Sequence, residues 1–275
     1  MKNKVRAQRI LGISALAGLT GTVIMGLWVT PPDAVQGDLA RFVYIHPPVA
    51  WVGYLAFGVC AMASLAWLWP RTRAQHWDRL AGAAGEVGVV FFALTLVTGS
   101  IWGRPAWGVW WTWDARLTTS AILLILFVGY LALRRVPGDP IVRARRSAIA
   151  ALIAALDVPI VHMSVLWWRT LHQAPTVLGP DLNPTIHGSM AWTLLLGFVS
   201  FTLVFGWMLA VRYRIGALEE RCEQDGLSIA LVERRAEAAM SPVGAAGPTD
   251  TLPGRGAGDA SGMPSHADNP VGANR

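Results

Sequence analysis

Charged residues are scarce in this chain of 275 residues. Only 15% of its residues are charged and 53% are hydrophobic, whereas about a quarter of the residues of soluble domains are charged. The mean hydropathy is +0.43. The apolar residues occur in runs of roughly 18–25, the length that a helix needs to cross a bilayer. The composition therefore excludes an ordinary soluble domain and indicates a polytopic membrane protein.

Cysteine is almost absent, and several sequence motifs are missing altogether. The two cysteines, Cys60 and Cys222, form neither C-x-x-C nor C-x-x-C-H, which excludes a thiol oxidoreductase of that type and a c-type haem acceptor. We expect them to lie in different compartments and not to pair. The chain also lacks G-x-x-x-x-G-K-[ST], so any ATP hydrolysis would belong to a partner.

The apolar runs predict an all-α membrane protein, a bundle of six transmembrane helices. The predicted spans are residues 10–29, 47–69, 80–101, 118–133, 147–167 and 188–211. The first span follows basic residues, as a signal peptide would, but it is too long and no A-x-A-like cleavage site follows it. We therefore expect an uncleaved anchor.

The distribution of Lys and Arg predicts the orientation of the spans. One set of connections and ends is rich in these residues, whereas the opposite set holds only Arg41, Arg104, Arg116 and Arg169. Because cytoplasmic loops carry the excess of positive charge, we expect both termini in the cytoplasm and a tryptophan-rich loop, between the third and fourth spans, on the outer face. The high isoelectric point follows from this topology and gives no reason to invoke nucleic acid.

The composition divides the chain into three parts. Residues 1–212 form the predicted membrane domain, and residues 213–240 are expected to extend the last span as a cytoplasmic helix, broken near Gly226. Residues 241–275 are rich in Gly, Ala, Pro, Ser, Asp and Asn without a periodic apolar face. Such composition predicts a disordered tail.

The stretch "WGRPAWGVWWTWDARLT", residues 102–118, holds five tryptophans within twelve residues. Tryptophan often anchors span ends at the membrane interface, but five exceed what anchoring requires. Gly103, Pro105 and Gly108 are expected to interrupt a regular helix, and glycines between indoles would let the rings lie flat against a broad planar ligand. The residues alone favour a ligand platform over an aromatic belt.

This stretch resembles the tryptophan-rich WWD signature of haem-handling proteins of cytochrome c maturation. With six spans and the signature between the third and fourth, residues 9–212 resemble the cytochrome c maturation protein C (haem exporter protein C) family. The resemblance implies a non-covalently bound haem b. The implied haem-binding residues within the signature are Trp102, Trp107, Trp110, Trp111, Trp113, Asp114 and Arg116.

Histidine is the commonest protein ligand for such iron. His76 and His266 lie on the cytoplasmic side of the predicted topology, which leaves His46, His162, His172 and His187. The resemblance implies His46 and His172 as the axial ligands, although the first family histidine is more usually followed by Val-Pro than by Pro47-Pro48. It implies no ligand role for His162, and His187 remains a rival.

Haem propionates are anionic, and Arg suits bidentate carboxylate binding. Of the four outer arginines, Arg116 is favoured because it lies within the signature. The residues inside the spans that could serve a channel are few: Glu86, Asp157 and His162.

The resemblance implies a haem-delivery protein of the bacterial inner membrane, not an enzyme, with its haem site facing the periplasm. Its implied partners are the periplasmic haem chaperone called cytochrome c maturation protein E, a small single-span protein D, and ABC transporter subunits A and B. One alternative is a haem lyase, although such relatives are longer and carry an additional intramembrane histidine pair. Another alternative is a haem permease or channel subunit.

Overall fold

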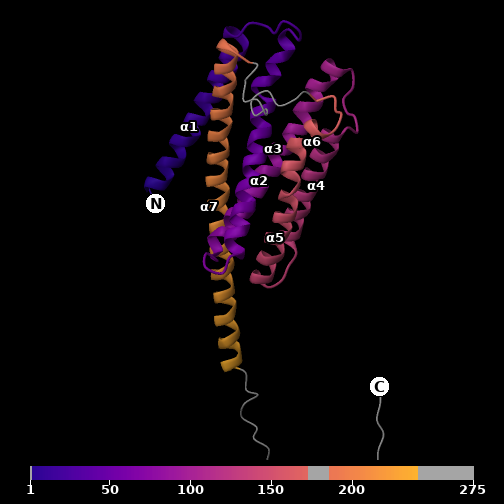
Figure 1. The fold of residues 1–275 in the computed structure, drawn as a ribbon. Coiled ribbons are helices and arrows are strands. Elements are labelled where there is room, and N and C mark those ends of the chain that lie inside the picture. The colour runs from indigo at the N-terminus through magenta and orange to yellow at the C-terminus, as the bar shows by residue number, and fades with distance from the viewer. Residues whose placement is uncertain (1, 173–185, 241–275) are drawn as a thin grey trace, which may run out of the picture. The chain divides into compact units, whose positions relative to one another are not determined.

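The computed structural model describes residues 2–172 and 186–240, and these are nearly all helical (Figure 1). The described part of the chain contains no β-strand. Its elements are α1 (Lys2–Ile24), the π-helical turn η1 (Met25–Val29), the 3₁₀ segment η2 (Asp38–Tyr44), α2 (His46–Leu68), α3 (Gln75–Trp107), α4 (Ala115–Arg135), α5 (Pro140–Ala155), α6 (Asp157–Trp167) and α7 (Gly188–Met240).

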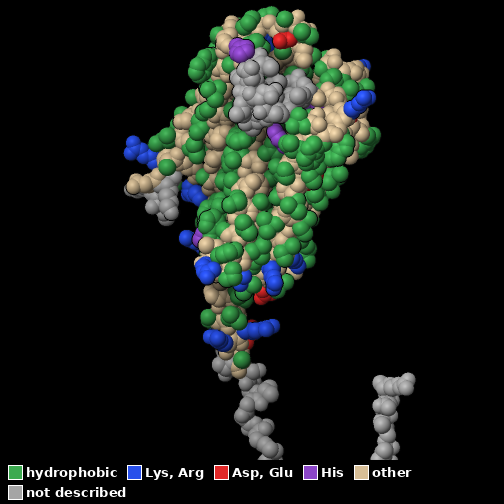
Figure 2. Space-filling model, in the orientation of Figure 1, with side chains coloured by type: hydrophobic (Ala, Val, Ile, Leu, Met, Phe, Trp, Pro, Cys, Tyr) green, Lys and Arg blue, Asp and Glu red, His purple; other side chains and the backbone are tan. Residues whose placement is uncertain are grey.

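Six helical segments are long and apolar enough to cross a membrane, which confirms the predicted six-helix class. They are Val5–Val29, Asp38–Leu68, Gln75–Trp107, Ala115–Arg135, Pro140–Trp167 and Gly188–Ala238. Hydrophobic side chains cover the middle of the helices, and Lys and Arg side chains concentrate towards the start of α1 and of α3 (Figure 2). This distribution agrees with the charge asymmetry of the sequence, and the orientation of the termini stays a prediction.

The chain divides into two compact units, Met1–Gln224 and Asp225–Arg275. Helix α7 continues through Gly226, so the break predicted there is wrong. No atom would lie within 4 Å of a Cβ at Gly226, and no neighbouring group is therefore in place to bend the helix. The predicted tail, residues 241–275, lies outside the described residues, and the domain boundary at residue 212 stays a prediction.

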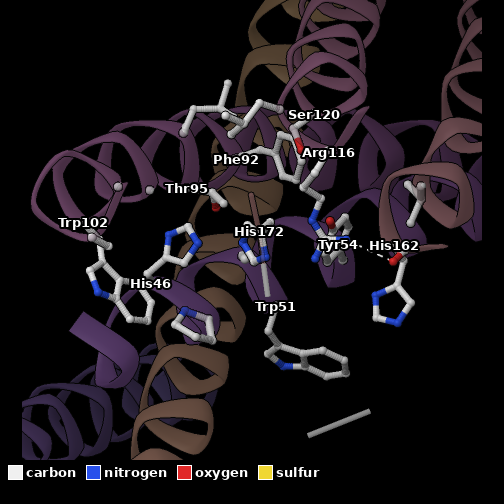
Figure 3. A pocket seen from close by; sticks show the side chains of 18 of the residues that line it. His46, Trp51, Tyr54, Phe92, Thr95, Trp102, Arg116, Ser120, His162 and His172 are labelled. Atoms are coloured by element: carbon white, nitrogen blue, oxygen red, sulfur yellow. Dashed lines mark hydrogen bonds between the residues drawn. The ribbon is translucent and has the colours of Figure 1, made fainter. Parts of the chain in front are cut away.

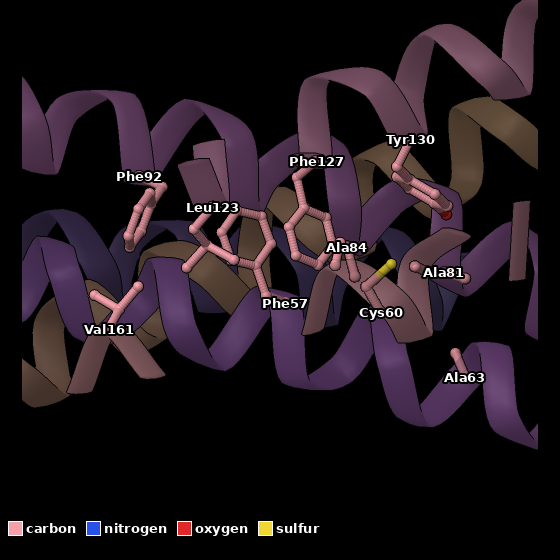
Figure 4. Packing of buried hydrophobic residues seen from close by; sticks show 12 residues of the cluster. Phe57, Cys60, Ala63, Ala81, Ala84, Phe92, Leu123, Phe127, Tyr130 and Val161 are labelled. Carbon is pink, nitrogen blue, oxygen red and sulfur yellow. The ribbon is translucent and has the colours of Figure 1, made fainter. Parts of the chain in front are cut away.

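A cluster of packed aromatic side chains joins α2, α3 and α4 (Figure 4). Phe57 stacks on Phe127 with ring centres 3.7 Å apart, and Phe92 packs against Phe57 at 5.5 Å. A Cβ at Gly88 would lie 2.6 Å from the Phe57 ring. Gly88 therefore lets α3 approach α2 closely. The aromatic cluster packs together the helices that carry the site.

The fifth predicted span consists of two helices, which corrects the expectation of a single one. Helix α5 ends at Ala155 and α6 begins at Asp157. The break follows from Pro159, which has no N–H to donate to the carbonyl of Ala155 and whose ring crowds that carbonyl. Helix α6 is thus a separate element of 11 residues, and it carries His162.

The third predicted span is longer than expected. Helix α3 runs through Gly103 and Pro105 to Trp107, so the expected interruption at these two residues is wrong. Pro105 has no N–H to donate to the carbonyl of Ile101, and the helix continues past it by only two residues. The helix ends instead at Gly108, whose positive φ of 80° suits glycine. Its N–H donates to the Arg104 carbonyl at 2.9 Å.

Candidate functional site

A cavity of about 540 Å³ lies among α2, α3, α4, α6 and α7 (Figure 3). Its volume falls in the range of about 300–1,000 Å³ typical of small-molecule and cofactor sites. Three histidines and three tryptophans from segments far apart in the sequence line it: His46, His162, His172, Trp51, Trp102 and Trp107. The cavity therefore combines aromatic walls with several potential iron ligands.

His46 is the first residue of α2, one residue before the predicted start of the second span. Pro47 and Pro48 occupy the first turn, where their missing N–H groups have no helical partner to lose. The segment before His46 rests against α7 at Gly197, where an added Cβ would lie 2.9 Å from the Tyr44 carbonyl oxygen. The helix start and this close contact fix the position of the His46 main chain.

The His46 ring lies against α3. Its Nδ1 is 3.0 Å from the hydroxyl oxygen of Thr98, and a Cβ at Gly99 would lie 3.0 Å from its Cε1. The ring of Trp102 meets it edge to face, with centres 5.9 Å apart. With Nδ1 engaged by Thr98, Nε2 is the ring nitrogen left for another partner.

His172 follows α6 and reaches the same cavity. Its ring centre lies 6.4 Å from that of His46 and 6.0 Å from that of Trp107. Figure 3 shows the two imidazoles side by side. The structure thus brings together the two histidines that the sequence placed in the first and third outer connections.

Trp102 and Trp107 are the two tryptophans of the 102–118 stretch that line the cavity. The indole N–H of Trp102 donates to the side-chain oxygen of Gln36 at 3.0 Å. A Cβ at Gly103 would lie 3.0 Å from the Trp107 ring, so Gly103 makes room for that indole. Both tryptophans stand on the last turns of α3.

Trp110, Trp111 and Trp113 do not line the cavity. Trp110 and Trp113 are 61% and 79% exposed, and Trp111 packs edge to face on Trp113 with ring centres 5.5 Å apart. The structure thus places these three indoles apart from the cavity, and their expected part in haem binding stays a prediction. Because α3 continues to Trp107, the stretch is half helix and half irregular segment, and its two halves face different surroundings.

Asp114 also lies outside the cavity lining, although the sequence grouped it with the haem-binding residues. One carboxylate oxygen accepts the Leu117 N–H at 2.9 Å and so caps α4. The other accepts the Thr170 hydroxyl at 2.9 Å and the Leu171 N–H at 3.1 Å. The Thr170 hydroxyl oxygen in turn accepts the His172 N–H at 2.9 Å. Asp114 therefore holds the His172 segment.

Of the four arginines that the sequence predicts on the outer side, Arg116 lines the cavity. Its Nη1 donates to the carbonyls of Val161 at 2.6 Å and His162 at 3.0 Å, which joins α4 to α6. The other three have different surroundings. Arg41 pairs with Asp38 at 2.8 Å, Arg104 donates to the Gly108 carbonyl, and Arg169 is exposed.

The other histidines differ in whether they line the cavity. His162 lines the cavity from α6, whereas His187 is exposed and outside the lining, and His76 lies beside Trp77 at the start of α3. His266 lies outside the described residues. Within residues 2–172 and 186–240, no group of three or more His, Cys, Asp or Glu side chains could hold a free metal ion.

Sequence reasoning missed the residues that hold the two histidines. Gln36, Thr98 and Thr170 each make a hydrogen bond to Trp102 or to a cavity histidine. A signal existed for Thr98, because Thr95 and Thr98 are among the few polar residues of a largely apolar span. Nothing in the sequence marked Gln36 or Thr170.

Comparison with known proteins gives consistent similarity over most of the chain. A family model described as "Heme exporter protein C" matches residues 2–228. A curated protein of that name from Haemophilus influenzae is 37% identical over 198 residues, covering 72% of this chain and 79% of the relative. One from Escherichia coli K12 is 36% identical over 214 residues, covering 77% and 84%. One from Bradyrhizobium diazoefficiens is 40% identical over 178 residues, covering 64% and 66%.

Proposed function

This chain belongs to the haem exporter protein C family, which acts in cytochrome c maturation and haem export, and we propose that it holds a haem b in the cavity with His46 and His172 as axial ligands. The observation that carries the proposal is the distance of 6.4 Å between the two imidazole centres. The haem is cargo, held without a covalent bond and then passed on.

The distance fits a shared iron. A metal–imidazole bond is about 2 Å long, and the ring centre lies roughly 1 Å beyond the nitrogen. Two imidazoles on opposite sides of one iron then have centres about 6 Å apart. The contact of His46 Nδ1 with Thr98 leaves Nε2 as the ligating atom.

The walls suit the rest of the haem molecule. Trp102 and Trp107 offer flat apolar surface beside the histidines, and aromatic rings contribute broad contact in such sites. Arg116 is the outer arginine at the cavity, and its guanidinium provides a partner for a propionate carboxylate. Trp110 and Trp113, which are exposed, are left for contact with a protein that receives the haem.

The charge asymmetry supports a periplasmic location for this site in the bacterial inner membrane. A site there can deliver haem to a periplasmic carrier, and we take this carrier to be the haem chaperone called cytochrome c maturation protein E. The small protein D and the ABC transporter subunits A and B complete the assembly that we propose. The chain itself acts in delivery and not in catalysis.

The test is the optical spectrum of the purified protein. Wild type is expected to show six-coordinate low-spin haem. His46→Ala or His172→Ala removes one of two iron bonds but leaves the aromatic contact, so we expect retained haem with a shift towards high-spin and partial reversal by added imidazole. Haem-loaded wild type incubated with the purified apo chaperone is expected to lose haem to it.

His187→Ala is the matched control, because this exposed histidine lies outside the cavity. It is expected to leave the spectrum unchanged. A high-spin shift in His187→Ala together with an unchanged spectrum in His172→Ala would overturn the ligand assignment. A wild-type protein purified without haem and unable to bind added haem would overturn the function.

A further inference from the structure

Thr98 has two hydrogen-bonding neighbours of different kinds. Its hydroxyl oxygen lies 2.8 Å from the main-chain carbonyl oxygen of Leu94, one turn earlier on α3, and 3.0 Å from Nδ1 of His46 on α2. A carbonyl oxygen can only accept, whereas a neutral imidazole nitrogen either donates or accepts. The direction of the first bond therefore constrains the second.

We propose that Thr98 is a positioning residue that fixes His46 in the tautomer with its proton on Nδ1, and so leaves the Nε2 lone pair for the haem iron. A hydroxyl has one proton, and Thr98 uses it for the hydrogen bond to the Leu94 carbonyl oxygen. The Thr98 oxygen then presents a lone pair to Nδ1, which must supply the proton of the second bond. This inference rests on the proposed function for its use, but the tautomer itself belongs to the protein without haem.

Two further contacts strengthen the assignment. The Thr95 carbonyl oxygen lies 3.2 Å from the Thr98 hydroxyl oxygen. It is a second hydrogen-bond acceptor for the hydroxyl proton on the same side of α3. Gly99 follows directly, and a Cβ there would lie 3.0 Å from Cε1 of His46. The Thr98–Gly99 pair thus supplies both the hydrogen bond and the flat contact that orient the ring.

The consequence is a preformed ligand. Iron binding requires an unprotonated imidazole nitrogen, and partners of the other ring nitrogen fix the ring's orientation and raise its basicity as a ligand. Loss of such a partner typically weakens metal affinity by about 10- to 100-fold. A hydrogen bond to Nδ1–H also favours the more highly charged ferric iron, because it increases electron donation from the ring.

The first test measures the tautomer without haem. Nitrogen-15 NMR of apo protein labelled at histidine, with His46 assigned by comparison with His46→Ala, is expected to show Nδ1 protonated in wild type and in Thr98→Ser. In Thr98→Val, which keeps the shape but lacks the hydroxyl, the signal is expected to move to Nε2–H or to a mixture of both tautomers. A wild-type ring protonated on Nε2 would overturn the proposal, whatever the protein does with haem.

The second test measures the ligand. Thr98→Val is expected to bind added haem about 10- to 100-fold more weakly, with a smaller low-spin fraction and a more positive midpoint potential, and Thr98→Ser is expected to restore all three. Thr119→Val is the matched control, because the Thr119 hydroxyl makes the same type of bond, 2.7 Å to the Ala115 carbonyl, outside the cavity lining. An unchanged tautomer, affinity and potential in Thr98→Val would refute the role of Thr98.

Discussion

The carboxylate of Asp114 both caps α4 and holds the segment before His172. Asp114→Asn is expected to keep the cap and to weaken the hold on that segment. Its first oxygen caps α4 through Leu117, and its second accepts the Thr170 hydroxyl and the Leu171 N–H. Asn caps helices as well as Asp does, so the amide oxygen keeps the cap. The amide NH₂ then replaces the second oxygen and faces the Leu171 N–H, a donor that it cannot pair with.

The size of the effect follows from the bond to the Leu171 N–H, which is lost, and from the bond to the Thr170 hydroxyl, which survives only if the hydroxyl reverses and accepts from the amide NH₂. Hydrogen bonds to charged groups contribute about 1.5–3 kcal/mol each, and the half-exposed position of Asp114 favours the lower value. A loss of about 2–3 kcal/mol lowers the population of the held His172 segment by roughly 30- to 150-fold. We therefore expect haem-loaded Asp114→Asn to shift from low-spin to mixed or high-spin, as His172→Ala does.

The assay is the low-spin fraction of the purified protein by optical and electron paramagnetic resonance spectra, with thermal unfolding in detergent as a check on the α4 cap. Thr170→Val, which removes the hydroxyl between Asp114 and the His172 N–H, is expected to give the same spectral shift. If Asp114→Asn keeps the wild-type spectrum while Thr170→Val loses it, the carboxylate does not hold the ligand and the reasoning fails.

Three further predictions concern the site and its orientation. Gly99→Ala places a Cβ 3.0 Å from Cε1 of His46, closer than the usual carbon contact of about 3.5–4.0 Å, so the low-spin fraction in the spectrum should fall; a wild-type spectrum would show that the ring has room. Trp107→Ala removes part of the cavity wall and should lower haem occupancy in a haem titration, whereas Trp110→Ala should leave it unchanged. Equal losses of haem in both variants would contradict the assignment of Trp107, but not Trp110, to the cavity. A topology reporter fused after Ala115 should report the outer side, and cytoplasmic activity would end the periplasmic model.

The sequence predicted the number and kind of the spans because the bilayer imposes a simple rule. A run of about 20 apolar residues is needed wherever a helix crosses, and each of the six predicted runs lies on a segment that is long and apolar enough. The errors arose at proline and glycine. Pro159 lies just after the break between α5 and α6, whereas α3 continues past Pro105 by only two residues.

The pairing of His46 with His172 was implied by the family resemblance, while the residues alone left His187 as a rival. His46 precedes two prolines that fix the start of a helix, and His172 follows a helix end in the connection on the same predicted side. Their partners could not be predicted. Thr98 contacts His46 across 52 residues of sequence, and Asp114 reaches Thr170 across 56. Such contacts depend on how far each helix is rotated, which hydropathy does not record.

The indoles of the tryptophan stretch have two kinds of surroundings, which composition alone does not distinguish. Five indoles in twelve residues are a single feature in the sequence, and Gly108 divides them in the structure. Trp102 and Trp107 lie before it on α3 and face the cavity, while Trp110 and Trp113 lie after it and are exposed. Exposed indoles cost free energy in water unless a membrane or a protein covers them, whereas indoles in a cavity are covered by its ligand. We therefore propose that Trp102 and Trp107 contact the cargo, whereas Trp110 and Trp113 contact a membrane or a protein surface, with the turn at Gly108 between the two pairs.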